Sequence, residues 1–170
     1  SVFRTLSVSF EQRNSWTFNG TSLGSDGEID FEADFINQWK FEAEAAYHSS
    51  DIDTRLLRGG YDVRMPANTE IAFGLQSDPS KKFIAHAEYQ YMKGAGNSAT
   101  AWTFQPGISV RPFSLLKIGI NAEYEENIDE LQYITTKSMV ESGKRYILGT
   151  ISQKTLGLTF RVDLNLSPEF

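Results

Sequence analysis

The sequence contains no cysteine, which excludes disulfide bridges and thiolate metal sites. It has no run of about 18 or more apolar residues, so we expect no transmembrane helix. Its two histidines, His48 and His86, have no third ligand at a recognisable spacing, and we predict no metal and no cofactor. The 16 Lys and Arg are outnumbered by 22 Asp and Glu and form no basic stripe, which argues against nucleic acid as a partner.

Aromatic residues, by contrast, are plentiful. The 170 residues include 12 Phe, 7 Tyr and 3 Trp, yet the mean hydropathy is only −0.36. Many aromatic residues within a polar average are typical of a chain whose apolar residues are dispersed singly. Alternating β-strands disperse them in this way, and buried helices do not.

Apolar and polar residues alternate along most of the chain, with the period of a β-strand. The alternation is most regular at 28–35, at 39–48 and at 155–166. One face of the last stretch carries Leu156, Leu158, Phe160, Val162, Leu164 and Leu166. The pattern predicts roughly ten to twelve strands of about 9–12 residues, the length that a tilted strand needs to cross a bilayer.

The connections between these strands are predicted to differ in length. The short ones lie near Asn37–Gln38, Asp78–Lys81 and Arg111–Ser114, and the longer ones at 49–67, 94–98 and 137–144. The polar segment 125–130 is expected to interrupt the extended pattern. Two separate strands, 145–151 and 155–166, are expected to follow it.

Two kinds of protein share this alternation: a soluble sandwich packs its apolar face inward, whereas a membrane barrel turns that face to lipid. Strand length favours the barrel, and so do aromatic residues at strand ends, as in interfacial girdles. These are Phe3, Phe10, Trp39, Tyr47, Tyr91, Trp102, Phe104, Phe113, Tyr124, Tyr133 and Tyr146. The predicted fold is therefore all-β, an antiparallel up-and-down transmembrane β-barrel or a fragment of a larger one.

The chain starts inside a strand-like pattern at Ser1–Phe3 and stops at Ser167–Phe170, which has the composition of a turn. We expect residues 1–170 to form a single β-barrel segment that is truncated at both ends. The alternative is a soluble β-sandwich or β-barrel that binds glycans through exposed aromatic residues such as Trp39 and Trp102.

Two parts of the sequence resemble a known family. They are Asp53–Gly60 (DTRLLRGG) with Val63–Pro66, and the run that includes Leu131–Tyr133, Arg145–Gly149 and Gln153–Val162. Both resemble the family called domain of unknown function 5916, which is common in Bacteroidota. The resemblance implies an outer-membrane barrel that usually follows a carbohydrate-binding-family-9-like domain, and that domain is not among these residues.

The pattern and the resemblance together predict a non-enzymatic protein of the cell outer membrane. It would act as a pore, an anchor or a subunit of a cell-envelope complex. Its expected partners are outer-membrane lipid and, further, other envelope proteins or its own N-terminal domain. An acidic lumen would give an open pore a mild preference for cations.

Arg55, Arg58, Gly59 and Gly60 are the best candidates for a ligand-binding site. The two arginines beside a flexible glycine pair could hold a carboxylate or phosphate through bidentate contacts. The simpler interpretation is that the glycines form a turn or bulge while the arginines pair with carboxylates of the lumen.

Alternating carboxylates mark two neighbouring predicted strands. They are Glu28, Asp30, Glu32, Asp34, Glu42 and Glu44. Such residues can form a glycosidase pair or a calcium site. A solvated strand face shows the same alternation, and no nucleophile motif is present, so we predict no catalytic residue and no enzymatic activity.

Overall fold

The computed structural model describes residues 2–139 and 143–165, and these residues form β-strands almost throughout. The strands are β1 (Phe3–Trp16), β2 (Ser22–Phe35), β3 (Lys40–His48), β4 (Asp51–Asp53), β5 (Val63–Met65), β6 (Asn68–Gln76), β7 (Phe83–Gly94), β8 (Ala99–Phe113), β9 (Leu116–Met139) and β10 (Gly143–Leu164). A single 3-10 turn, η1 (Ala95–Asn97), joins β7 to β8. In the described part of the chain, no helix has the length and apolarity to cross a membrane.

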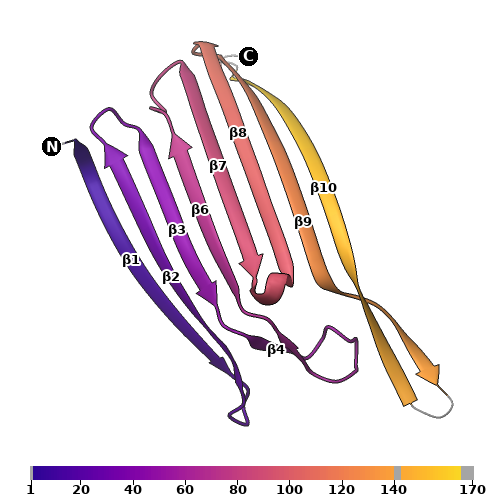
Figure 1. Ribbon diagram of the computed structural model, residues 1–170. Coiled ribbons are helices and arrows are strands. Elements are labelled where there is room, and N and C mark those ends of the chain that lie inside the picture. Colours follow the sequence, from indigo (N-terminus) through magenta and orange to yellow (C-terminus); the bar gives the residue numbers. More distant parts are fainter. Residues whose placement is uncertain (1, 140–142, 166–170) are drawn as a thin grey trace.

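Eight of the strands form one curved antiparallel layer in the order β1-β2-β3-β6-β7-β8-β9-β10 (Figure 1). Each strand lies beside the one before it in the chain, apart from the separate hairpin β4–β5 between β3 and β6. The prediction of an all-β, antiparallel, up-and-down chain is confirmed. The sheet is open, since among the described strands β1 and β10 each have one neighbour.

The register of the strands divides the sheet into an apolar face and a polar face. Residues directly opposite one another on neighbouring strands point to the same side. One such row joins Val8, Phe31, Ala43, Phe73, Tyr89, Phe104, Tyr124 and Leu156. The adjacent row, on the other face, joins Ser9, Asp30, Glu44, Ala72, Gln90, Thr103, Glu125 and Thr155.

The apolar face is uncovered. Leu156, Leu158 and Phe160 on β10 are 78%, 75% and 65% exposed, although they share one apolar stripe. The buried apolar residues of the described chain are only Ala33, Ala46, Leu57 and Ile84. Residues 2–139 and 143–165 contain no second layer that packs on this face, so the sheet has no ordinary hydrophobic core.

Two predicted interruptions of the strands are wrong. Segment 125–130 lies inside β9, and residues 152–154 lie inside β10, so the last two predicted strands are one. The reason is cross-strand pairing: Lys154 lies opposite Glu126, with their charged atoms 3.1 Å apart. The pair of opposite charges lets polar residues continue a strand.

The third short turn lies later than predicted. Strand β8 runs through Arg111 and Pro112 to Phe113, and the chain reverses at Ser114 and Leu115. Two other predicted features fall wholly or partly outside the described residues. They are Ser167–Phe170, with Leu166, and the middle of the 137–144 loop.

The two ends of the sheet differ. Strand β1 begins and β10 ends at the same end, where the connections β2–β3, β6–β7 and β8–β9 are short (Figure 1). The opposite end carries the long segment 49–67 and the protruding β9–β10 hairpin. The β7–β8 connection at that end is as short as the turns at the other, so its predicted extra length is wrong.

Asp78 organises the turn between β6 and β7. Its Oδ1 accepts hydrogen bonds from the Ser80 backbone N–H at 2.8 Å and from the Ser80 hydroxyl at 2.6 Å. These bonds lower the pKa of the Asp78 carboxyl, and nearby Lys81 lowers it further. The charged form therefore stabilises the turn predicted at Asp78–Lys81, and this contribution is lost as the pH falls through the lowered pKa.

Candidate functional site

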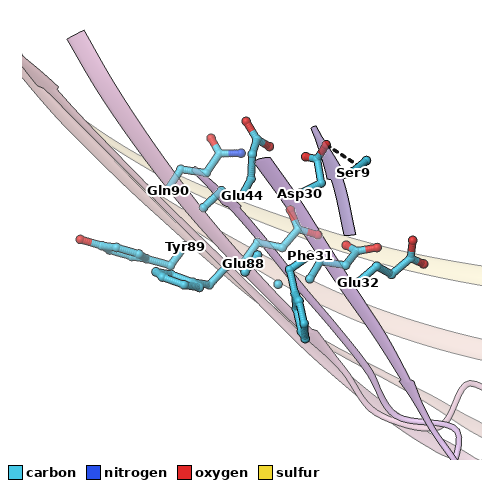
Figure 2. Close-up of a pocket in the computed structure, with 13 residues that line it drawn as sticks. Ser9, Asp30, Phe31, Glu32, Glu44, Glu88, Tyr89 and Gln90 are labelled. Carbon is cyan, nitrogen blue, oxygen red and sulfur yellow. Dashed lines mark hydrogen bonds between the residues drawn. The ribbon is translucent and has the colours of Figure 1, made fainter. Parts of the chain in front are cut away.

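The most distinctive feature of the polar face is a hollow of about 420 Å³ over β2, β3, β6 and β7. We call it the acidic trough. Its charged and polar walls are Asp30, Glu32, Glu42, Glu44 and Glu88, with Ser9 and Gln90. Figure 2 shows the carboxylates on one side of the sheet and the rings of Phe31 and Tyr89 on the other.

The register of β6 creates the trough. Glu42 and Glu88 both lie opposite Gly74, and Glu44 and Gln90 both lie opposite Ala72. The small residues on β6 leave space between the longer acidic side chains of β3 and β7. A hollow with carboxylates on both sides is the result.

Few positive charges balance the acidic trough. Lys40 Nζ lies 2.8 Å from Glu32 Oε1 and also contacts the Glu42 carboxylate. Ser9 donates a hydrogen bond to Asp30 Oδ2 at 3.0 Å. Among the described residues, neither Glu44 nor Glu88 has an ion pair within 4.0 Å. The trough therefore has an excess of negative charge and attracts cations.

Three carboxylates come especially close. One oxygen from each of Glu28, Asp30 and Glu44 lies within 4.8 Å of the other two. Carboxylate oxygens are the ligands that Ca²⁺ prefers, so these side chains are the described group that could hold a divalent cation. Exposed acidic groups commonly lie this close without an ion, and the absence of a resident metal stays a prediction.

The predicted Arg-Gly site lies elsewhere, in the connection between β4 and β5. Asp53 Oδ1 accepts the Arg55 backbone N–H at 2.6 Å, and φ is +49° at Arg58 and +92° at Gly59. The chain thus makes a tight left-handed turn, as the simpler interpretation expects. Ligand binding by Arg55, Arg58, Gly59 and Gly60 stays a prediction.

This turn reaches the β9–β10 hairpin. The Arg58 guanidinium lies 5.3 Å from the centre of the Tyr133 ring, and the Tyr61 and Tyr146 rings meet edge to face with centroids 6.1 Å apart. A Cβ built at Gly60 would lie 2.5 Å from the Tyr146 ring. We call Arg58, Tyr61, Tyr133 and Tyr146 the aromatic clasp, because they join two segments that are distant in sequence.

Replacing Tyr146 with alanine should release the turn from the hairpin. An aromatic pair contributes about 0.5–1.5 kcal/mol beyond its buried area, so trypsin should cleave after Arg55 or Arg58 roughly three to ten times faster. Limited proteolysis followed by mass spectrometry measures the rate. Tyr47→Ala removes an exposed tyrosine outside the clasp and should leave it unchanged. Equal rates in both variants would show that the clasp does not hold the turn.

The two histidines occupy separate places. His48 Nδ1 lies 3.0 Å from Asp26 Oδ1, and its Nε2 lies 3.8 Å from Glu70 Oε1. His86 lies against Gly107, where an added Cβ would meet its ring. The described structure does not bring them together, in agreement with their unrelated positions in the sequence.

A comparison with known protein families matches the whole chain. The family described as domain of unknown function (DUF5916) covers residues 1–170. The chain belongs to the DUF5916 family. No curated protein and no solved structure matches it. The match extends the resemblance seen from Asp53 onward back through β1, β2 and β3, so the strands that carry most of the acidic trough are part of the DUF5916 domain.

Proposed function

We propose that this DUF5916 chain forms part of the wall of an outer-membrane β-barrel without enzymatic activity. The barrel acts as a pore, an anchor or a subunit of a cell-envelope complex. The supporting observation is the uncovered apolar face of a single-layer sheet. A water-soluble protein rarely exposes so large a contiguous apolar surface, whereas lipid covers such a surface on a membrane barrel.

The apolar band has a limited height, which suits a bilayer. On β10 it runs from Leu164 to Leu156 and stops at Lys154, which pairs with Glu126 on the same face. Eight residues span about 27 Å along a strand, or about 21 Å along the membrane normal at a tilt of about 40°. Apolar bands of outer-membrane barrels are about 25 Å tall.

Aromatic residues border this band on both sides. Toward the end with the long connection, Trp102 stacks between Tyr124, at 5.0 Å, and Tyr89, at 6.5 Å between ring centroids. Toward the short-turn end, the Phe3 and Phe35 rings lie 5.2 Å apart. Amphipathic rings at these two levels are typical of the two interfaces of a membrane.

The polar face would line the inside of the barrel. Its acidic trough needs water, because carboxylates without counter-charges are costly to place in an apolar medium. Outer lipid and an inner aqueous space together account for both faces of the sheet.

A soluble glycan-binding module remains the alternative proposal. It would need another layer over the apolar face, and the described strands do not supply one. Trp102 is stacked between two tyrosines on that same face, which suits an interface girdle as well as a sugar platform. The membrane proposal explains the whole face, whereas glycan binding explains only parts of it.

Cell fractionation tests the proposal. We expect the protein to sediment with the outer membrane, to resist extraction by high salt and by alkaline carbonate, and to dissolve only with detergent. The solubilised protein should keep the circular dichroism of a β-sheet. Recovery as a detergent-free monomer in the soluble fraction would contradict the proposal and favour the binding module.

A further inference from the structure

The edges of the eight-stranded sheet carry a further inference, which rests on the proposed membrane function. We infer that the barrel wall has more than eight strands, and that an even number of further strands of the same polypeptide, outside residues 1–170, join β10 to β1. The lumen is then wide and filled with water. The partner that these edges fit is an antiparallel β-strand at each side.

The edges need partners because the strands lie in lipid. Unpaired backbone N–H and C=O groups in hydrocarbon cost several kcal/mol each, so open edges do not occur there. In the described sheet, β1 pairs only with β2 and β10 only with β9. The simplest closure would pair β1 with β10 of the same chain and give an eight-stranded barrel.

The charges of the polar face oppose that simple closure. The interior of an eight-stranded barrel is just wide enough for side chains to fill it. The carboxylates that would be packed there are Glu11, Glu28, Asp30, Glu32, Glu42, Glu44, Glu70, Glu88, Glu123 and Glu125. A described cation lies near only four of them: Arg13 near Glu11, Lys40 near Glu32 and Glu42, and His48 near Glu70.

Burying the remaining carboxylates without cations would leave several uncompensated charges in a medium of low dielectric constant, which is strongly unfavourable. A wider wall moves the opposite sides of the lumen apart and keeps the carboxylates in water. The acidic polar face therefore predicts additional strands.

Strand direction fixes the parity of those strands. Strand β1 runs away from the short-turn end and β10 runs back toward it (Figure 1). All seven pairings within the sheet are antiparallel. Strands that alternate in direction can connect these two edges only if their number is even.

Chain order indicates where the strands come from. Each strand of the sheet lies beside the preceding strand of the chain, apart from the small β4–β5 hairpin. Neighbouring strands in barrels usually follow one another along the polypeptide. The partner of β10 is therefore a strand that follows it in the same polypeptide, and the partner of β1 is one that precedes it.

Cysteine cross-linking in the membrane-inserted protein, as its cell makes it, tests this inference. The described chain has no native cysteine to interfere. Ser7→Cys on β1 is combined in turn with cysteine at each polar-face position of β10 from 147 to 163, so that every register is sampled. Asn121→Cys with Thr159→Cys, which face one another on β9 and β10, is the control pair that should form a disulfide on oxidation.

We expect the control pair to cross-link and every β1–β10 pair to stay unlinked. A disulfide within one chain would overturn the inference in favour of eight-stranded closure. A disulfide-linked dimer would overturn it in favour of closure by a second copy. All samples come from the membrane fraction, so these outcomes are distinct from failure of the protein to insert, which would contradict the proposed function itself.

A second measurement gives the inference a positive readout. Gln90→Cys places a thiol on the wall of the acidic trough. In a wide aqueous lumen, a membrane-impermeant cationic thiol reagent should modify it within about tenfold of the rate for a free thiol of equal pKa. A packed interior would block modification, and that result would also overturn the inference.

Discussion

Replacing Leu158 with arginine should sharply reduce insertion into lipid. Leu158 lies in the middle of the apolar band and is 75% exposed, with no described residue covering it. Arginine on the lipid face near the bilayer midplane costs about 2–4 kcal/mol in outer-membrane barrels. Denaturant titration of the protein refolded into phospholipid vesicles should show a loss of stability of that size, with less protein in the membrane fraction.

Thr159→Arg provides the matched control, because Thr159 is the next residue of β10 and faces the polar side. In a barrel it should cost little, since the new guanidinium would lie in water near the acidic polar face. In a soluble protein, by contrast, an exposed Leu158 would tolerate arginine within about 0.5 kcal/mol. Equal tolerance of the two arginines would therefore show that the apolar face does not meet hydrocarbon.

The faces of individual strands could be predicted from the sequence because the period of a strand is local. Leu156 to Leu164 alternate with Gly157 to Asp163, and the ladder between β9 and β10 places them on opposite faces as expected. Strand ends were harder to predict. Polar residues at 125–130 have the composition of a connection, and only their pairing with β10 keeps them extended.

The acidic trough could be predicted only in part. Asp30, Glu32, Glu42 and Glu44 stand out in the sequence, because they alternate along two adjacent strands. Glu88 does not, since it joins them only through Gly74 on β6. A small residue between two acidic strands is the signal that could have located the hollow, and it requires the register.

Aspartate and arginine at two other positions show the same limit. Asp34 belongs to the acidic pattern, but it pairs with Arg4 at 3.2 Å and does not line the trough. Arg58 was expected either to bind a ligand or to pair with a carboxylate, and it lies over the Tyr133 ring instead. Both contacts join distant segments, so neither spacing nor composition could have predicted them.

Neutralising the acidic trough should reduce the preference of the pore for cations. A quadruple variant, Asp30→Asn with Glu42→Gln, Glu44→Gln and Glu88→Gln, removes four negative charges from one hollow while keeping the side chains nearly isosteric. Charged walls in confined water create potentials of several kT, so the cation-to-anion permeability ratio should fall at least about threefold. Reversal potentials across a planar bilayer under a salt gradient measure this ratio.

A single pair of variants separates the trough from the overall charge of the protein. Glu44→Gln and Glu126→Gln each remove one carboxylate, but Glu44 lines the trough, whereas Glu126 lies on the apolar face beside Lys154. Only Glu44→Gln should lower the ratio, and the effect should shrink at high salt because the field is screened. An anion-selective parent pore, or equal ratios in both variants, would show that the acidic trough does not line the conducting lumen.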